Sequence, residues 1–405
     1  MQRFVFPRWQ PARRGPVTLS HMQDPRFYRR PSGPVYFPSL NGLRFVAALL
    51  VIVHHIEQQR LYLGRPTYWF VPAVQRIGDE GVTLFFVLSG FLITYLLLVE
   101  QERFGRIAVG RFYGRRVLRI WPLYYATGVL GLLILPGISW LQGAGVHTAF
   151  TSHWLQKAAL YVVLLPNVSL VLAGGVPYLL QAWSIGTEEQ FYLLWPWVVR
   201  GAGKRVLPVV GGVLLALLLA KRLIVLGYHT AGPSAGSWLT FAFNFLYYFR
   251  LECLVIGAVP AVMLFQQCRP ALRWLMAPPV QWLALLVTLG LLAWGQQFAL
   301  HEELYAGLFA ILILNLAAAK HPVFSLETGW LDYLGKLSYG LYMLHPLAIG
   351  VVLHTLAPWL DSNTGSFSGL LTLLATLGLS IGLAMVSYYG LELPFLRRKA
   401  RLARV

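Results

Sequence analysis

The chain has 405 residues, of which 57% are hydrophobic and only 12% are charged, and it includes 14 Trp and 20 Tyr. A soluble domain of this length does not need so much apolar surface, and several apolar runs reach the roughly 20 residues that span a bilayer. The net charge of +18 raises the question of nucleic-acid binding, but the basic residues follow a membrane topology. We therefore predict an all-α, polytopic membrane bundle whose partner is the lipid bilayer and not a nucleic acid.

The domain organisation follows from the two ends of the chain. Residues 1–38 hold seven arginines and several prolines without an apolar core, which is typical of a loosely ordered arm and not of a cleavable signal peptide. We predict a basic cytoplasmic arm at 1–38, a transmembrane domain at 39–396 and a basic cytoplasmic tail at 397–405. Cys253 and Cys268 provide neither a disulfide framework nor the spacing of a metal site, so no metal or tightly bound cofactor is expected.

Apolar runs predict ten membrane-spanning helices, which places both chain ends on one side of the membrane. Segments on that side hold 25 of the 33 basic residues, against 6 on the opposite side, so both termini are predicted to be cytoplasmic. The stretch 155–173 is interrupted by Pro166 and Asn167 and is interpreted as re-entrant or interfacial, whereas 237–266 is predicted to contain a helix break. The predicted spans are 40–57, 81–99, 120–140, 180–199, 206–223, 240–266, 279–298, 303–319, 335–356 and 368–391.

The first predicted span, LNGLRFVAALLVIVHHIE, carries Arg44 and His55. Eleven helical steps bring the two side chains within roughly 20° of one face and about 16 Å apart along the axis. Ionisable residues inside a span are expensive and usually mark a functional path. The alternative is that Arg44 extends to the membrane interface while His55 satisfies a buried partner. His54 precedes His55 and stays a second candidate.

The segment RFYGRRVLRIWPLYY (111–125) begins the third predicted span on its cytoplasmic side. Arg116 and Arg119 are three residues apart and share a helix face, with Arg115 nearby. Forked guanidinium groups at a membrane surface suit phosphate binding. The alternative is that the arginines are only a positively charged flank of the span.

Further polar residues occur at membrane depth in later segments. WSIGTEEQFYLLWP (183–196) contains Glu188 and Glu189, which point about 100° apart on a helix, so only one of them can face a given partner well. Arg250 lies inside the long stretch 237–266. Structural ion pairs or hydrogen bonds are the alternative explanation for these groups. SYGLYMLHP (338–346) adds four candidates, namely Ser338, Tyr339, Tyr342 and His345. The alternative for His345 followed by Pro346 is a helix kink.

Taken in order, six segments resemble the integral-membrane acyltransferase-3 family: NGLRFVAALLVIVHH, GVTLFFVLSGFLI, RFYGRRVLRIWPLYY, WSIGTEEQFYLLWP, LGKLSYGLYMLHP and ELPF. The resemblance extends from about residue 38 to 396. It implies an O-acyltransferase of the bacterial cytoplasmic (inner) membrane. The enzyme would move an acyl group, acetyl in the simplest case, from acyl-coenzyme A as cosubstrate to a sugar hydroxyl. The acceptor would belong to a cell-surface or exported polysaccharide or to a lipid-linked glycan.

The resemblance also implies roles for individual residues. Arg44 and His55 match the family's basic residue and histidine, and Arg116 and Arg119 match its pair associated with the acyl-coenzyme A donor. His55 is then expected to be the general base, with an acyl-histidine intermediate as the alternative. Arg44 or Arg250 would stabilise the oxyanion, or Arg44 would hold the donor. The remaining matches are Glu188 or Glu189 and the set Ser338, Tyr339, Tyr342, His345 and Pro346.

Two other functions are compatible with buried ionisable residues in a membrane bundle. A transporter or flippase for a glycan or lipid-linked substrate could use them as a relay, although the chain has no internal repeat. An acyltransferase that modifies a small glycosylated metabolite, such as an antibiotic, would keep the same donor chemistry with a different acceptor.

Overall fold

The computed structural model describes residues 35–37, 39–141, 146–232, 236–295, 300–319, 321–364 and 367–402. Within these ranges every regular element is a helix, as predicted. The predicted basic arm at 1–38 lies outside the described residues except for 35–37, and so do residues 403–405 of the predicted tail. The α-helices are α1 (Ser39–Tyr62), α2 (Pro72–Phe104), α3 (Val109–Val129), α4 (Val146–Thr151), α5 (Trp154–Val162), α6 (Pro166–Leu172), α7 (Trp183–Ala202), α8 (Val206–Ala231), α9 (Ser237–Leu246), α10 (Leu251–Gln266), α11 (Arg269–Leu275), α12 (Pro278–Trp294), α13 (His301–Ala318), α14 (Gly329–Lys336), α15 (Ser338–Thr355), α16 (Ala357–Asn363), α17 (Ser368–Ser387) and α18 (Leu393–Ala400).

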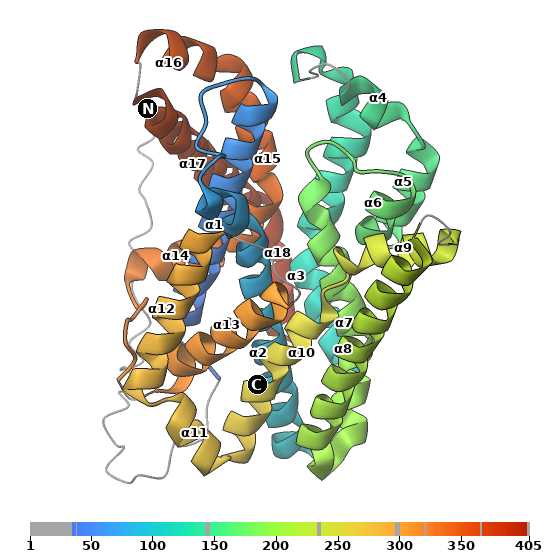
Figure 1. The fold of residues 1–405 in the computed structure, drawn as a ribbon, viewed down its shortest axis with the longest axis vertical. Helices are drawn as coiled ribbons and strands as arrows, with labels where there is room; N and C mark the ends of the chain where they lie inside the picture. The colour runs from blue at the N-terminus through green and yellow to red at the C-terminus, as the bar shows by residue number, and fades with distance from the viewer. Residues whose placement is uncertain are drawn as a thin grey trace.

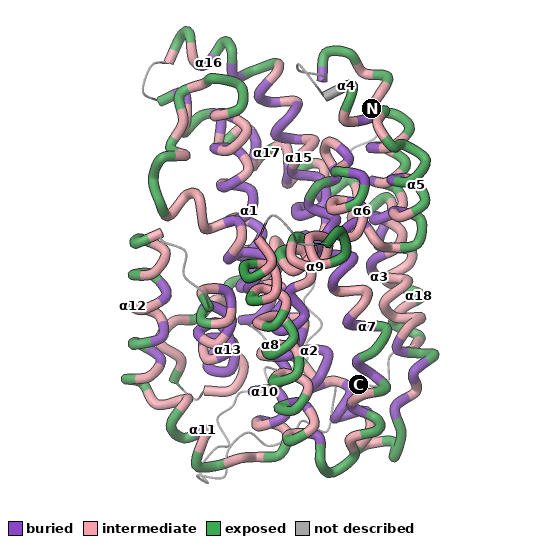
Figure 2. The backbone as a smooth tube through the Cα atoms, turned by 45° about the vertical axis from the view of Figure 1, so that its right-hand side comes forward, coloured by how far each residue is buried: buried purple, intermediate pink, exposed green. Residues whose placement is uncertain are grey.

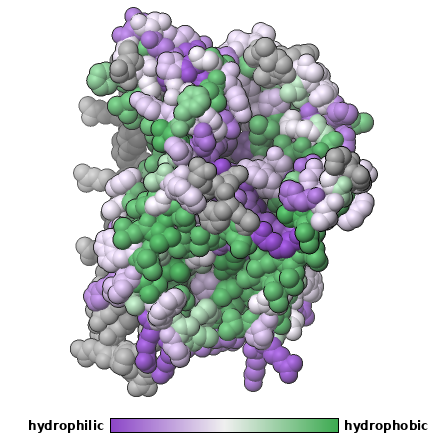
Figure 3. All heavy atoms as spheres, in the orientation of Figure 1, coloured by the Kyte–Doolittle hydropathy of each residue, from purple (hydrophilic) through white to green (hydrophobic). Residues whose placement is uncertain are grey.

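The long helices run roughly along the long axis of the molecule, with α4 and α16 at one end and α11 at the other (Figure 1). A band of hydrophobic residues covers much of the face seen in Figure 3, and hydrophilic residues gather toward both ends. This distribution fits a bundle that crosses a bilayer, because the hydrocarbon core requires apolar side chains along its whole thickness.

The core of the bundle is organised around α2, which packs against α1 on one side and α10 on another. Gly90 of α2 lies directly against the backbone at Leu254 of α10, and Gly257 of α10 lies against the backbone at Val87 of α2. A side chain at either glycine would collide with the facing helix. Small residues allow this close approach, which drives helix association in a membrane where the hydrophobic effect between helices is absent.

The outer helices leave their apolar side chains uncovered. On α8, Val206 and Val210 are the buried residues, whereas Leu215, Leu219 and Leu223 are more than half exposed. Figure 2 shows the same contrast between the exposed outer helices and the buried turns of α1 and α2. Leucines that face outward over several turns are suited to lipid chains.

Six helical stretches are long and apolar enough to cross a membrane, or up to nine when each bent pair of helices counts as one span, within the described ranges. Each of the ten predicted spans overlaps one of these nine stretches, and residues 296–298 of the predicted span 279–298 lie outside the described residues. One stretch, Leu180–Ala231, contains both α7 and α8 and has 52 residues. A helix of that length would extend about 78 Å, far more than one crossing, and the chain breaks at Gly203. A multi-pass helical membrane protein is therefore supported, while the count of ten and the orientation stay predictions.

Both unusual stretches are irregular in the structure. Residues 155–173 form the two short helices α5 and α6, and neither is a candidate span. The predicted break within 237–266 is confirmed, because α9 and α10 meet at an angle of 44° with Arg250 at the start of α10. Lys221 and Arg222, counted with the external loops, instead lie on α8, because this helix continues to Ala231.

Candidate active site

A cavity of about 320 Å³ lies between α1, α2, α3, α7, α15 and α18. We call it the donor cavity, after the role that the family resemblance implies for Arg116 and Arg119. Its lining includes four basic side chains and one acidic side chain, which leaves a formal excess of three positive charges: Arg44, Arg116, Arg119 and Lys399 against Glu188. Such an excess in a partly enclosed, low-dielectric space favours a ligand with several negative charges.

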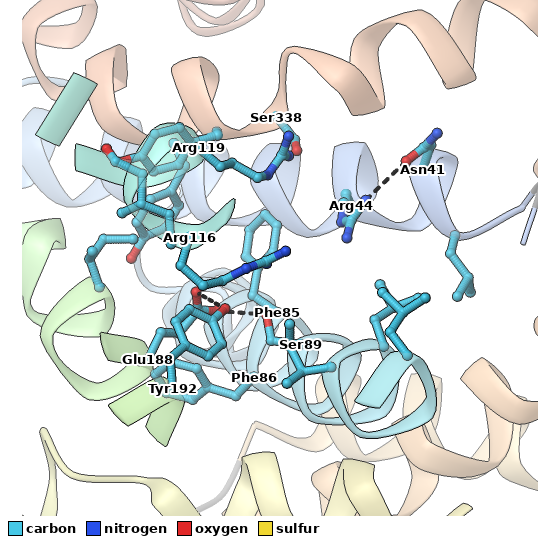
Figure 4. Close-up of a pocket in the computed structure, with 18 of the residues that line it drawn as sticks. Asn41, Arg44, Phe85, Phe86, Ser89, Arg116, Arg119, Glu188, Tyr192 and Ser338 are labelled. Atoms are coloured by element: carbon cyan, nitrogen blue, oxygen red, sulfur yellow. Dashed lines mark hydrogen bonds between the residues drawn. The ribbon is translucent and has the colours of Figure 1, made fainter. Parts of the chain in front are cut away.

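Arg116 and Arg119 extend from α3 toward the part of α1 that carries Arg44 (Figure 4). Their three-residue spacing places both on one face of α3, as predicted. The Arg116 guanidinium carbon lies 5.7 Å from the centre of the Tyr192 ring, and its Nε has no hydrogen-bond partner in the described part of the chain. Arg44 donates a hydrogen bond to Asn41 Oδ1 at 3.0 Å. The guanidinium groups of the three arginines thus line one cavity, and they are not each paired with a carboxylate of their own among the described residues.

Lys399 is a member of the cavity that sequence analysis did not single out. It lies on α18, which packs against α3 and so brings Lys399 to the donor cavity. Three consecutive basic residues, 397–399, begin the predicted tail, and adjacent residues on a helix point about 100° apart. No pattern in the sequence indicates which of them faces inward, so this position required the packing of α18.

The two adjacent glutamates point to different neighbours, as their spacing predicts. Glu188 lines the donor cavity and accepts hydrogen bonds from Ser89 and from Tyr192, each at 2.8 Å. Glu189 instead accepts a hydrogen bond from Trp121 Nε1 at 3.4 Å and is not part of the cavity lining. The structure therefore brings Glu188 and not Glu189 to the donor cavity, with Ser89 and Tyr192 as further neighbours.

A second cavity, of about 180 Å³, contains both His54 and His55, and we call it the histidine cavity. Tyr342 lines this cavity and the donor cavity, so the two adjoin at that side chain. Arg44 and His55 therefore reach two neighbouring cavities from the same helix. Ser338 and Tyr339 lie on the donor side of this boundary.

His55 and His345 form a pair whose proton positions follow from their partners. His345 Nδ1 lies 2.8 Å from the carbonyl oxygen of Tyr342, which can only accept, so Nδ1 carries the proton. The Nε2 of neutral His345 is then an acceptor for His55 Nδ1, 3.1 Å away. The Nε2 atom of His55 is left with a free lone pair.

The proline at 346 explains why the Tyr342 carbonyl is available. In an α-helix this oxygen would accept the backbone N–H of residue 346, but proline has none. His345 takes the vacant acceptor instead. The His-Pro sequence therefore fixes the tautomer of His345, because the proline removes a backbone donor. A helix kink is not needed to explain the proline at this position.

His54 has a different environment from His55. Its Nδ1 donates to the carbonyl oxygen of Val74 at 3.0 Å, and its ring occupies the space beside Gly78 of α2. A Cβ at Gly78 would collide with the His54 ring. The ring therefore packs α1 against α2, although it also borders the histidine cavity.

Arg250 and Arg115 are paired with carboxylates, and one of these carboxylates, Asp79, lines the histidine cavity. Arg250 is buried, lies 3.1 Å from Glu302 and 3.6 Å from Asp79, and stacks on the Tyr247 ring at 4.6 Å. Arg115 pairs with Glu100 at 3.0 Å. Neither side chain lines the two cavities, so their predicted contacts with the oxyanion and the donor stay predictions. No group of three or more His, Cys, Asp or Glu residues able to hold a metal ion occurs among the described residues.

Comparison with known proteins gives a family match over most of the chain. Residues 37–389 match the family model described as an acyltransferase domain. A Staphylococcus aureus (strain COL) protein, provisionally named an O-acetyltransferase, is 27% identical over 392 residues, covering 89% of this chain and 57% of the relative. The O-acetyltransferase OatA of Staphylococcus aureus (strain NCTC 8325 / PS 47) is 28% identical over 336 residues, covering 77% of this chain and 50% of the relative. The chain thus spans about half the length of these relatives. No solved structure matches it significantly.

Proposed function

The chain belongs to the acyltransferase domain family, and from this membership we propose that it is a multi-pass membrane O-acyltransferase. The transferred group is an acyl group, acetyl in the simplest case, because the related proteins carry the name O-acetyltransferase. The donor is acyl-coenzyme A and the acceptor is a sugar hydroxyl of a cell-surface, exported or lipid-linked glycan. The protein would act in the bacterial cytoplasmic membrane.

One observation carries this proposal. The donor cavity, with its excess of positive charge, adjoins the histidine cavity, where His55 Nε2 has a free lone pair. The donor cavity has an excess of three positive charges, which suits the phosphates of coenzyme A. Arg44 and His55 are about 16 Å apart along α1, so the flexible arm of the donor would extend from the cations past Tyr342. Its thioester would then lie beside His55.

The proposed reaction begins with proton removal by His55. Its Nε2 takes the proton of the acceptor hydroxyl, and the resulting alkoxide attacks the thioester carbonyl. The new bond joins the acceptor oxygen to the acyl carbon, and the carbon–sulfur bond breaks. The leaving thiolate takes the proton from His55. The products are free coenzyme A and the acylated acceptor, and His55 is neutral again. While His55 is positive, its Nδ1–H points to the His345 lone pair, which stabilises the charge.

Arg44 and Glu188 receive supporting roles in this proposal. Of the alternatives left open for Arg44, donor binding fits better, because its neighbours are Arg116 and Arg119 and not the histidine pair. Glu188 is held by Ser89 and Tyr192 at the wall of the donor cavity. We propose that it limits the repulsion among the cations when the cavity is empty.

The proposal is tested by comparing glycan and lipid extracts from cells that express the protein, His55→Ala or His54→Ala. Mass spectrometry should find glycans that gain one acetyl group only when the protein is present. We expect His55→Ala to lose this product at equal membrane abundance. His54→Ala should retain acylation, reduced in proportion to any loss of folded protein, because His54 packs against α2.

Two outcomes would contradict the proposal in different ways. Full acylation by His55→Ala with loss in His54→Ala would transfer the role of base to His54. Export of an unmodified glycan that depends on the protein, without any acylated product, would instead support the transporter alternative. Release of free thiol from acetyl-coenzyme A by purified protein distinguishes these cases, because a transporter does not cleave the thioester.

A further inference from the structure

A third cavity, of about 910 Å³, lies between α6, the second half of α8, α9 and the start of α13. It is the largest of the cavities described here, and neither the sequence motifs nor the family match assigns it a role. Leu170, Tyr247 and Tyr248 line both this space and the histidine cavity. It shares no lining residue with the donor cavity. The order is therefore donor cavity, histidine cavity and third cavity, with His55 between the two larger spaces.

The charges of the third cavity cancel one another. Lys221 contacts Glu252 at 2.7 Å, Glu302 at 2.6 Å and Glu303 at 3.1 Å. Arg222 lies 3.6 Å from Glu303. Two basic and two acidic residues line the space, so its formal charge is zero, in contrast to the excess of three in the donor cavity. A ligand here does not need a net charge.

The remaining lining combines aromatic rings with hydrogen-bonding groups. Phe243, Tyr247 and Tyr248 contribute rings, and Asn244 and His229 contribute polar groups. Tyr247 is 43% exposed, yet its hydroxyl donates to Asp79 Oδ1 at 2.7 Å and its ring contacts the Arg250 guanidinium. A ring fixed in this way presents a rigid apolar face. Rigid aromatic faces beside hydrogen-bonding groups fit the alternating C–H and O–H surface of an uncharged sugar.

The cavity adjoins the surface that faces lipid. On α8, Leu223 and Leu226 are 67% and 61% exposed, next to the lining residues Arg222 and Val225. Figure 3 shows hydrophilic residues interrupting the hydrophobic band on this face. Lys221 of α8 contacts Glu302 at the start of α13. An acceptor could therefore enter from the membrane side or from water.

We propose that the third cavity is the acceptor vestibule, which binds an uncharged sugar and directs one hydroxyl toward His55 Nε2. This inference rests on the proposed acyltransferase function and names the acceptor class and its entry. Tyr247 and Tyr248 form the passage from the vestibule to the histidine cavity. The ion-pair network of Arg250, Lys221 and Glu302 ties this passage to α8 and α13.

The test fills the vestibule without removing any of its contacts. Val225→Trp places a large side chain in the cavity, and Leu226→Trp places the same side chain on the adjacent, outward position of α8 as the matched control. Val225→Phe provides a smaller obstruction. Acylated product is measured by mass spectrometry in lipid and water-soluble glycan fractions, which separates a lipid-linked acceptor from a free one. Thermal stabilisation by coenzyme A measures donor binding in each purified variant.

We expect Val225→Trp to lose about 10-fold or more of the product, equivalent to about 1.4 kcal/mol, with Val225→Phe between it and the unaltered protein. Stabilisation by coenzyme A should be unchanged in both, and Leu226→Trp should behave like the unaltered protein. Equal product from Val225→Trp and Leu226→Trp, at normal coenzyme A stabilisation, would overturn the vestibule alone. Absence of acylated product from the unaltered protein would overturn the proposed function, and the vestibule with it.

Discussion

Among the described residues, four cations and one carboxylate line the donor cavity. Unpaired positive charges in a partly buried space repel one another, so their arrangement is more favourable when a polyanion is present. We expect the phosphates of acyl-coenzyme A to provide those charges. The planar forks of Arg116 and Arg119 would form paired hydrogen bonds that the single ammonium of Lys399 cannot form.

The first prediction concerns these arginines. Arg116→Ala or Arg119→Ala should raise the KM for acyl-coenzyme A by about 10-fold or more, because one charge-assisted hydrogen bond contributes about 1.5–3 kcal/mol. The KM for the acceptor should change little. Lysine at either position should restore part of the loss. Steady-state rates at varied donor and acceptor concentrations measure both constants.

Arg111→Ala is the matched control, because Arg111 is an exposed residue of α3 that does not line the donor cavity. A similar rise of the donor KM in Arg111→Ala would mean that the general charge of α3, and not the cavity, attracts the donor. An unchanged KM for acyl-coenzyme A in the Arg116→Ala/Arg119→Ala double variant would mean that both residues only orient the helix in the membrane.

At single positions, the sequence indicated candidate residues but not which side chains contact one another. Arg44 and His55 could be placed on one helix face because both lie on the same span. The contact between His55 and His345 joins residues 290 positions apart, and no spacing rule gives such a pair. Lys399 lies in a run of three basic residues, and no spacing rule indicates which of them faces the donor cavity. Glu188 could not be separated from Glu189 until their neighbours were known.

At the scale of an element, α15 shows how a helix can position a side chain by lacking one backbone hydrogen bond. Pro346 leaves the Tyr342 carbonyl without its usual donor, and His345 Nδ1 occupies it. The same helix carries Tyr342 at the boundary between the donor and histidine cavities. The sequence indicated a possible kink here, because a proline within a span suggests one. The hydrogen bond of the histidine became apparent only with the side chains in place.

The second prediction is that Pro346→Ala lowers kcat without raising the KM of either substrate. Alanine supplies a backbone N–H that competes with His345 for the Tyr342 oxygen, so the tautomer of His345 and the orientation of His55 become less restricted. We expect a decrease of about 10-fold, the equivalent of one hydrogen bond. Steady-state kinetics separate kcat from KM.

Pro260→Ala provides the control for proline removal, because Pro260 lies inside α10 and lines none of the three cavities. It should leave kcat unchanged. If both variants lose activity in proportion to a fall in thermal stability, the effect of Pro346 is structural. A selective loss of kcat in Pro346→Ala at unchanged stability supports the positioning role.

At the scale of the whole molecule, the order of the three cavities means that, under our proposals, the donor and acceptor approach His55 from different directions. Apolar length predicted where the long apolar helices lie, because it reflects the thickness of the bilayer, while the count of ten and the orientation from charge asymmetry stay predictions. Apolar length and charge asymmetry could not predict the packing of α2 between α1 and α10 or the cavities, which depend on contacts between distant helices. They also gave helix ends only approximately, as with Lys221 on α8.

The final prediction is that the donor cavity opens on the cytoplasmic side, with both termini cytoplasmic and ten spans. The protein is first made free of thiols at Cys253 and Cys268, and single cysteines are then placed at exposed positions. Arg106→Cys and Lys204→Cys should resist an impermeant thiol reagent in intact cells and react after the cells are opened. Asn363→Cys should react in intact cells, because it lies on α16 at the opposite end of the bundle from α11 (Figure 1). Labelling of Lys204→Cys from outside would reverse the cavities, and a donor made in the cytoplasm could then no longer reach Arg116 and Arg119 directly.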